Sequence, residues 1–424
     1  MFSNITTPLI GVVDMAVVGQ SADPHLIGAV AIGAQIFTMI FWAFGFLRMG
    51  TTGFTAQADG KGDKIEVFAI LMRALIIAAS AGLLIWVLQW PLSQISFYLI
   101  PGSDLVENAA KTYFDIRVWS APATLANYAI LGWFIGLGRA DIALALQLLL
   151  NGLNIAFDAW FVLGFDWGVT GVAYGTLLSE VIAVAAGLLV SYLIISQKNL
   201  SGLWERVVSI KEMTRMLVLN SDIMIRTLCL LLAFVFLTAQ SAGVDDNTLA
   251  ANSVLLGLLS ISAYFLDGFA YAAERFVGHS IGAGNRKQFR QAIILSSQWA
   301  VFISVLVSLT FAIFGKQIIA AITPAQNVRD IAETYLIWAA MAPVVGVACF
   351  QLDGIFIGAT RTKDMRNMML LSLGIYFISW YLLEPVYGNH GLWAAFMLFF
   401  VARAVTLAWR LPALETSLRF RTDS

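Results

Sequence analysis

Apolar runs long enough to cross a membrane recur along the whole of this 424-residue chain. A helix needs about 20 predominantly apolar residues to span the hydrocarbon core of a bilayer. Hydrophobic residues make up 59% of the chain and charged residues 12%, whereas soluble globular domains contain about 45–50% and about 25%. We therefore expect an all-α membrane protein with twelve transmembrane helices. The expected spans lie near residues 2–20, 27–57, 66–90, 108–137, 142–164, 169–195, 214–243, 248–278, 288–314, 329–359, 366–384 and 391–411.

The two halves of the chain resemble each other. The segment Gly132–Arg139 matches Gly354–Arg361, 222 positions later, with five identities in eight. Each half holds six expected spans, and an even number inserts both halves in the same orientation, as in parallel transporter repeats. We therefore expect two pseudo-symmetric six-helix lobes, at residues 1–195 and 214–424. A cytoplasmic loop at 196–213 would join them, and the substrate path would lie between the lobes.

The distribution of Lys and Arg predicts how the chain crosses the membrane. These residues gather in the tail and in the loops after the second, fourth, sixth, eighth and tenth spans, while the loops after spans one, five, seven and eleven have none. Cytoplasmic loops of membrane proteins carry an excess of Lys and Arg. Both termini are therefore expected in the cytoplasm, with the chain passing many times through a bacterial inner membrane.

Several function classes lack their sequence requirements. The formal net charge is -1 and no segment forms a dense basic face, which argues against a nucleic-acid partner. No G-x-x-x-x-G-K-[ST] phosphate-binding loop occurs, so ATP would not act within this chain. No nucleophile accompanied by an oriented base is visible, so we expect a protein that is not an enzyme and needs no cofactor. Cys229 and Cys349 lie in apolar runs and are expected to be buried thiols.

Ionisable residues within the spans mark the candidate site. A charge at the bilayer centre costs about 2.5–3.5 kcal/mol on insertion scales, and such residues usually face an interior or a cavity. Asp14, Asn154 and Asp158 occur only in the first half, since the second half has apolar residues or glycine at the aligned positions. A shared scaffold is therefore a poor explanation for them. The plainer alternative is that Asn154 and Asp158 hydrogen-bond neighbouring helices.

The sixth expected span adds oxygen atoms to this set. Asn154 and Asp158 are four apart and so share one face of the fifth span, while Thr176 and Glu180 are four apart on the sixth. Hard cations such as Na⁺ prefer oxygen ligands, and a buried carboxylate also binds a proton more readily than an exposed one. Carboxylates beside Asn and Thr oxygens could therefore hold either Na⁺ or a proton.

The second half carries its own buried charges. Asp353 has no counterpart in the first half, and Asp267 and Glu274 are seven apart on one face of the eighth expected span. These residues are expected to line the C-terminal part of the substrate path, with buried structural hydrogen bonds as the alternative. Asp222 and Arg226 are four apart, and we expect them to pair with each other.

Four strings resemble those of a known family. They are Phe2–Gly19, Phe46–Gln57, Leu266–Glu274 and Leu352–Arg361, and they resemble the multidrug and toxic compound extrusion (MATE) family, in its DinF-type branch. The resemblance covers essentially the whole chain. It implies a V-shaped fold of two six-helix lobes and export of organic molecules in exchange for H⁺ or Na⁺.

The resemblance also implies roles for particular residues. The cation site of the family uses an Asp on helix 1, an Asn and an Asp one turn apart on helix 5, and a Thr on helix 6. These positions match Asp14, Asn154, Asp158 and Thr176, and an acidic position on helix 10 of some relatives falls near Asp353. A bound Na⁺ would take the same four residues as ligands.

The sequence thus predicts a secondary-active efflux antiporter for multiple organic compounds, driven by an H⁺ or Na⁺ gradient and working by alternating access. Its partners would be small amphipathic or cationic organic molecules and the lipid bilayer, and it would act as a monomer. The alternative is a flippase for lipid-linked sugars or other anionic amphipathic substrates. That function calls for a path lined with basic residues, which Arg48, Arg226 and Arg275 could supply.

Overall fold

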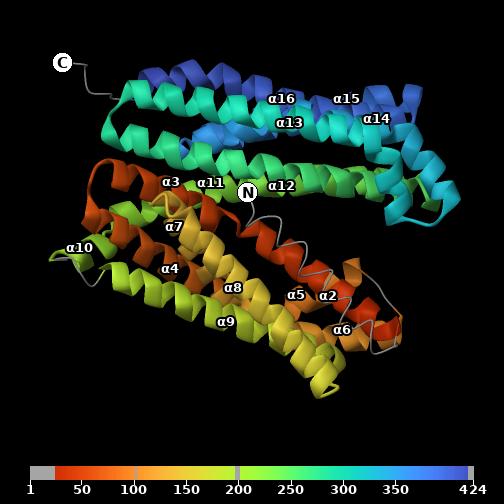
Figure 1. Cartoon of the computed structure of the whole chain (residues 1–424), viewed down its shortest axis with the longest axis horizontal. Helices are drawn as coiled ribbons and strands as arrows, with labels where there is room; N and C mark the ends of the chain where they lie inside the picture. The colour runs from red at the N-terminus through yellow and green to blue at the C-terminus, as the bar shows by residue number, and fades with distance from the viewer. Residues whose placement is uncertain (1–23, 101–102, 196–200, 419–424) are drawn as a thin grey trace. The chain divides into compact units, whose positions relative to one another are not determined.

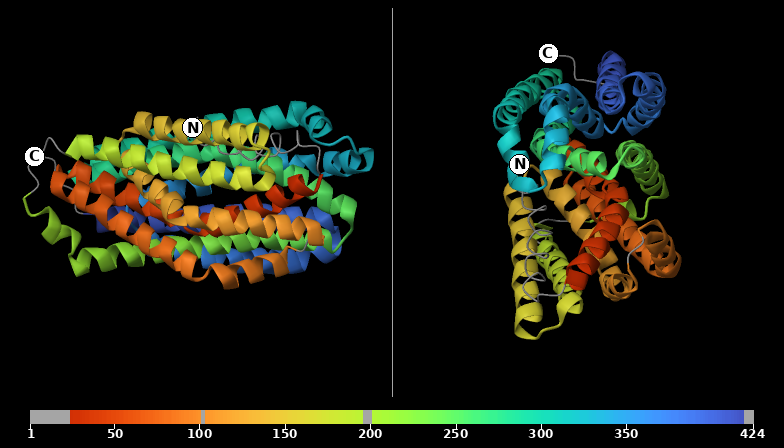
Figure 2. Two further views of the ribbon diagram at one scale, coloured as in Figure 1. Left: turned by 90° about the horizontal axis from the view of Figure 1, so that it is seen from below. Right: turned by 90° about the vertical axis from the view of Figure 1, so that its right-hand side faces the viewer.

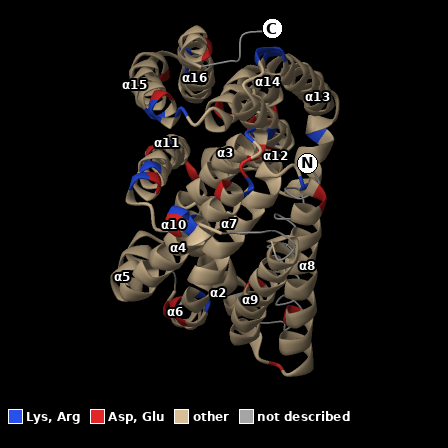
Figure 3. Cartoon of the chain, turned by 90° about the vertical axis from the view of Figure 1, so that its left-hand side faces the viewer, with Lys and Arg blue, Asp and Glu red and all other residues tan. Residues whose placement is uncertain are grey.

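The computed structural model describes residues 24–100, 103–195 and 201–418. Within these ranges the chain is helical and has no β-strand (Figure 1). Ten helical stretches among the described residues, one of them running from His25 to Gly60, are long and apolar enough to cross a membrane. The all-α membrane architecture predicted from the apolar runs is therefore confirmed, and Figure 3 shows that most of the helical ribbon carries neither acidic nor basic residues.

The chain forms two compact units, the first of which comprises residues 2–59 and 63–216. Its helices are α2 (Pro24–Ala43), α3 (Phe46–Gly60), α4 (Lys64–Val87), α5 (Gln89–Leu99), α6 (Asp104–Arg117), α7 (Ala121–Gly136), α8 (Ala140–Asp158), α9 (Gly168–Ile195) and the short α10 (Leu203–Val207).

Two of the expected spans are interrupted in this unit. The fourth, near 108–137, is α6 and α7 joined by the 3₁₀ turn Val118–Ser120. Pro122 stands in the first turn of α7, where its missing N–H costs no helical hydrogen bond. The second expected span consists of α2 and α3. The first, near 2–20, lies outside the described residues.

The second unit comprises Gly60–Gly62 and Leu217–Ser424. Its core is rich in aromatic side chains, among them Tyr376, Trp393 and Phe396, each with no exposed surface. Cys229 and Cys349 are buried free thiols, as predicted. Figure 2 shows further views of these helices, which are α11 (Ile210–Ala242, beginning in the first unit), α12 (Asp246–Ala283), α13 (Arg286–Ile322), α14 (Gln326–Gly358), α15 (Thr362–Tyr387) and α16 (Asn389–Ser417).

The internal repeat has a structural counterpart in two close helix contacts. A Cβ atom added to Gly132 of α7 would lie 2.3 Å from the carbonyl oxygen of Arg48 on α3. A Cβ atom added to Gly354 of α14 would lie 2.4 Å from the carbonyl oxygen of Ala270 on α12. Both members of each pair are 222 positions from their equivalents. Small residues let membrane helices approach closely, so the two units use the same contact.

The segment before α11 is attached to the first unit. Helix α10 packs on α4, and Val207 of α10 is fully buried. The guanidinium of Arg206 donates to Asp63 Oδ2 at 2.6 Å and lies 3.5 Å from Glu66 Oε2. Residues 203–216 therefore fold as part of the first unit, at the end of the loop expected over 196–213.

Candidate cation site in the first unit

The hairpin of α8 and α9 places the expected residues against each other. Helix α8 ends at Asp158, and the π-helical segment Ala159–Gly164 follows directly. The chain then turns through Asp166 and Gly168, both with positive φ, and α9 packs back along α8. Single π-helical segments inside helices are frequent at functional sites, and here the change of helix type falls at Asp158.

Asn154, Asp158 and Thr176 form one hydrogen-bonded set. The side-chain amide Nδ2 of Asn154 donates to Asp158 Oδ2 at 3.0 Å and to Thr176 Oγ1 at 3.3 Å. The Thr176 hydroxyl itself donates to the carbonyl oxygen of Val172 at 2.9 Å. Asn154 and Asp158 have no exposed surface, and Thr176 is 7% exposed. The structure thus brings together three of the four predicted residues, while Asp14 lies outside the described residues.

These contacts fix the orientation of the Asn154 amide. Because the Thr176 hydroxyl gives its hydrogen to Val172, its oxygen must accept, and the amide nitrogen of Asn154 is the donor that it meets. The amide oxygen Oδ1 of Asn154 is buried and has no hydrogen-bond partner within the described ranges. Buried polar atoms nearly always have a partner, so this oxygen is an open acceptor for water or for a further group.

A glycine leaves room for the Asp158 carboxylate. A Cβ atom added to Gly175 of α9 would lie 2.1 Å from Asp158 Oδ1 and 3.2 Å from the Asp158 backbone nitrogen. Only a residue without a side chain allows the carboxylate to lie against the α9 backbone at this point. Gly175 precedes Thr176, so one turn of α9 supplies both the space and a hydroxyl. Gly175 was not among the residues expected at the site.

A second buried carboxylate, Glu180, lies one turn further along α9. Asn127 Nδ2 donates to Glu180 Oε2 at 2.6 Å and to the Glu180 backbone oxygen at 3.1 Å. The guanidinium of Arg117 is 3.9 Å from Glu180 Oε1, donates to the Ser120 hydroxyl, and lies over the rings of two phenylalanines, Phe37 and Phe41. Arg117 and Asn127 were not among the predicted site residues.

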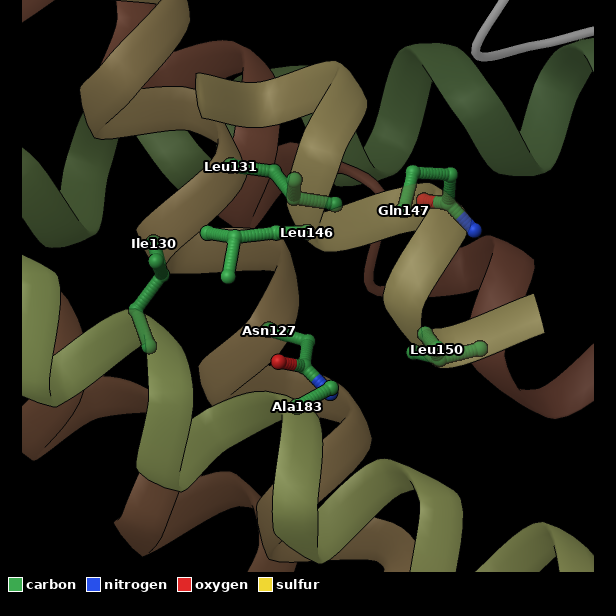
Figure 4. A pocket seen from close by; sticks show the side chains of 7 residues that line it. All are labelled: Asn127, Ile130, Leu131, Leu146, Gln147, Leu150 and Ala183. Atoms are coloured by element: carbon green, nitrogen blue, oxygen red, sulfur yellow. The ribbon is translucent and has the colours of Figure 1, made fainter. Parts of the chain in front are cut away.

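The polar residues of α8 continue along one helical face. Gln147 Nε2 donates to Asn151 Oδ1 at 2.9 Å, and Gln147, Asn151, Asn154 and Asp158 follow one another at steps of four, three and four. Such spacing places all four on one side of the helix. Of these four, Gln147 lines a cavity of about 10 Å³, which is close to the minimum for one water molecule. Figure 4 shows its lining, which is Asn127, Ile130, Leu131, Leu146, Gln147, Leu150 and Ala183.

In the second unit, Asp353 is held by two arginines. Its Oδ2 accepts from Arg403 Nη2 at 2.7 Å and from Arg226 Nη2. All three side chains are buried. The Arg403 guanidinium also lies 5.5 Å from the ring centre of Phe399 and 5.7 Å from that of Phe400. Asp353 is therefore the centre of a buried ion-pair network that joins it to two arginines.

The expected pair of Asp222 and Arg226 is wrong. Arg226 bonds to Asp353, whereas Asp222 accepts from Arg366 Nη1 at 2.6 Å and from the Thr362 hydroxyl at 3.2 Å. Side chains four apart on a helix can meet, but each of these two faces a different helix that offers a closer partner.

Asp267 and Glu274 both belong to α12. Glu274 is 1% exposed, and Asp267 is half-buried and within electrostatic range of Arg403. Both lie in the same unit as Asp353, and their place along a substrate path stays a prediction. The described residues contain no group of three or more His, Cys, Asp or Glu side chains arranged to hold a metal ion.

A bundle of membrane-length helices with buried carboxylate–amide sites is the architecture of a polytopic transporter, and comparison with known proteins identifies the family. The MatE family model matches residues 1–160 and 223–382. The chain therefore belongs to the MATE family, whose members are multi-pass membrane transporters and not enzymes. The resemblance seen in the sequence is confirmed.

Individual relatives and solved structures agree with this assignment. The chain is 38% identical over 412 residues to DNA damage-inducible protein F of Escherichia coli strain K12, covering 97% of this chain and 90% of that protein. It is 25% identical to a probable multidrug resistance protein, NorM, of Rhizobium meliloti, covering 95% and 88%. A crystal structure of a MATE protein in a bent conformation matches its fold with a TM-score of 0.87 at 19% identity, covering 98% of this chain and 94% of that one.

Proposed function

We propose that this chain is a secondary-active antiporter that exports small amphipathic or cationic organic molecules in exchange for protons. The observation that carries this proposal is the fully buried Asp158 carboxylate, which accepts a hydrogen bond from the neutral Asn154 amide at 3.0 Å. Burial away from water favours the protonated form of a carboxylate. Asp14, expected on the first helix, would complete the site.

The orientation of Asn154 favours H⁺ over Na⁺. The amide nitrogen of Asn154 faces both Asp158 and Thr176, so an N–H group occupies the place where Na⁺ would need an oxygen ligand. A proton on Asp158 requires no such oxygen. Na⁺ coordinated by Asp158, Asn154 and Thr176 together would require the amide to turn over and give up its bond to the Thr176 hydroxyl.

Coupling would follow from the different protonation of two transport states. A proton that binds better to one arrangement of the lobes shifts the population toward it, and the affinity for substrate changes by the same coupling free energy. Each charge that moves down the membrane potential supplies about 2.3 kcal/mol per 100 mV. The protein would work as a monomer in a bacterial inner membrane, with both termini in the cytoplasm.

The alternative of a flippase for anionic lipid-linked substrates has less support. Arg226 was one of the three basic residues that could have lined a path for anions. It is buried and hydrogen-bonded to Asp353, which also accepts a hydrogen bond from Arg403. The relatives named as multidrug proteins favour export of small organic molecules instead.

The test is transport by the purified protein in proteoliposomes. A fluorescent lipophilic cation would be loaded, and its efflux followed under an imposed pH gradient and, separately, an imposed Na⁺ gradient. We expect the pH gradient alone to drive efflux, and Asp158→Asn to abolish it without loss of folded protein. Efflux driven by Na⁺ alone would contradict the choice of ion. Unchanged efflux by Asp158→Asn would contradict the site.

A further inference from the structure

We propose that Glu180 is a second proton-binding carboxylate, which takes the proton released by Asp158 through water held along a polar seam between α7, α8 and α9. The polar seam consists of Gln147, Asn151, Asn154 and Asp158 on α8, Asn127 on α7, and Thr176 and Glu180 on α9. The inference rests on the proposed function and adds the path by which the proton leaves the site.

The seam consists of three hydrogen-bonded groups on neighbouring helices. Asp158 bonds to Asn154, which bonds to Thr176, one turn before Glu180 on α9. On the other side, Gln147 bonds to Asn151 and lies at the rim of the cavity that Asn127 also lines. Figure 4 shows Asn127 beside Ala183, with Gln147 on the other side of the cavity. Asn127 in turn donates to Glu180.

Two buried polar atoms of the seam call for further partners. The amide nitrogen of Asn151 and the amide oxygen of Asn154 have no hydrogen-bond partner within the described part of the chain. Buried polar atoms nearly always have a partner, and ordered water commonly supplies one. Amides do not carry protons along a path, but water molecules held by amides do. The cavity lined by Asn127 and Gln147 has about the minimum volume for one water molecule, and the two unpaired amide atoms are further anchoring points along the seam.

The surroundings of Glu180 suit a carboxylate that gains and loses a proton. The guanidinium of Arg117 is 3.9 Å away from it. That guanidinium also contacts the Ser120 hydroxyl and two phenyl rings. Tyr128 is in electrostatic range of Glu180, Arg117 and Arg48. A distant cation stabilises the carboxylate after release without a bidentate pair that would hold it permanently charged.

The proton balance is simple. The proton leaves protonated Asp158, which becomes a carboxylate, and binds a carboxylate oxygen of Glu180, which becomes neutral. Glu180 then gives the proton to water at the Gln147 end of the seam and recovers its charge beside Arg117. Gln147 is two turns from the start of α8, after the Arg139 turn that the charge pattern assigns to the cytoplasm. The seam thus runs from Asp158 toward the cytoplasmic side.

Helix packing alone does not explain the polar residues of the seam. On α8 the opposite face carries exposed apolar residues such as Leu149 and Ala156, as expected where lipid is the neighbour. If packing alone had to be satisfied, apolar side chains could occupy these positions, and no side-chain amide would be buried. Polar residues inside membrane bundles are costly and usually mark ion or proton pathways.

The first test is Glu180→Gln in the full chain. Interior acidification of proteoliposomes, driven by a substrate gradient, would be followed with a trapped pH-sensitive dye. We expect substrate-coupled proton flux to fall by about tenfold or more, because a positioned acid–base group typically contributes about 10²–10⁴-fold to a proton transfer. The pH dependence of equilibrium substrate binding, which reports Asp158, should be unchanged. Glu180→Asp should recover part of the flux.

A matched control is Glu107→Gln. Glu107 lies on α6, pairs with Lys111 at 2.7 Å and is partly exposed, so the same chemical change is made outside the seam and should leave the flux at the wild-type level. Wild-type flux in Glu180→Gln would overturn the relay. If Asp158→Asn abolishes coupled transport in the same assay, the proposed function stands while the relay fails. If Asp158→Asn also has wild-type flux, the proposed function fails as well.

The second test fills the cavity without removing a titratable group. Ala183 is buried in its lining, and Ala183→Leu should slow the coupled flux while substrate binding persists. Ala156→Leu, on the exposed face of α8, is the control for added bulk. Gln147→Leu, at a half-buried position, gives the same test with less risk to folding. Wild-type flux in a folded Gln147→Leu or Ala183→Leu protein would overturn the water path.

Discussion

The carboxylate of Asp158 lies where a side chain at Gly175 would have to be: a Cβ atom on Gly175 would come within 2.1 Å of Asp158 Oδ1. Gly175→Ala should therefore push the carboxylate away from α9 and break its 3.0 Å bond with Asn154. We expect reduced proton-driven transport and a shifted pH dependence of substrate binding, measured in proteoliposomes and by equilibrium titration.

Gly152→Ala is the matched control, because a Cβ atom at Gly152 of α8 would contact nothing within 4 Å. Alanine is favoured over glycine inside a helix by about 1 kcal/mol, so both variants gain helix propensity. Only Gly175→Ala should lose transport. Equal transport by the two variants would show that the carboxylate can move without consequence.

The Asp353 ion-pair centre leads to a prediction about stability. Asp353→Asn would leave Arg226 and Arg403 buried beside a neutral group, and removing one partner of a buried ion pair costs about 3–5 kcal/mol. We expect a large fall in the melting temperature of the detergent-solubilised protein. Asp364→Asn is the control, since Asp364 pairs with the partly exposed Arg410 at 2.8 Å and exposed pairs contribute about 0–1 kcal/mol. A small fall in the melting temperature of Asp353→Asn would mean that other groups compensate the buried charges of the two arginines.

The helical architecture could be predicted because membrane burial leaves a direct trace in composition. Uncharged apolar runs of about 20 residues are typical of membrane-spanning helices, and the described helices follow them closely. The break between α6 and α7 was not predicted, because the apolar pattern continues through Val118–Ser120 and only the local backbone changes there. The internal repeat could be predicted for a similar reason, because Gly132 and Gly354 are both required by the same close contact between helices.

The candidate site was predictable where one helix carries its residues. Asn154 and Asp158 share a face through their spacing, and comparison of the halves separated them from the scaffold. Contacts between helices were not predictable, because spacing within one helix says nothing about what faces it. Asp222 and Arg226 could pair by spacing, yet each has a partner elsewhere. Likewise, no pattern in the sequence links Asn127 to Glu180.

One turn in the repeat carries strain in only one of its two copies. The turn after α7 has Gly138 at φ 75°, and the equivalent turn after α14 has Thr360 at φ 55°. A side chain in this region costs about 1–2 kcal/mol, and the greater freedom of glycine in the unfolded chain offsets part of that. Thr360→Gly should raise the melting temperature slightly, and Gly138→Thr should lower it. A fall on Thr360→Gly would show that a side-chain contact of Thr360 outweighs the strain.

The N-terminus of α12 provides a prediction about pH. The Thr248 hydroxyl donates to Asp245 Oδ2 at 2.6 Å and the Thr248 N–H donates to Oδ1 at 2.9 Å. These hydrogen bonds, the hydroxyl bond first, lower the pKa of Asp245 below its usual value. A carboxylate with a lowered pKa in the folded state stabilises the protein above its unfolded pKa, about 3.9, and this stabilisation is lost as the pH falls through the folded value.

Asp245→Ala should therefore melt at a lower temperature than the wild type at pH 7, and the difference should shrink below about pH 4. Because other groups titrate in both proteins, the difference between their melting temperatures isolates the Asp245 contribution. Asp245→Asn keeps one oxygen as a helix cap but cannot ionise, so its melting temperature should approach that of the wild type only at low pH. A difference between Asp245→Ala and wild type that stays constant from pH 7 to pH 3 would show that the cap acts without its charge.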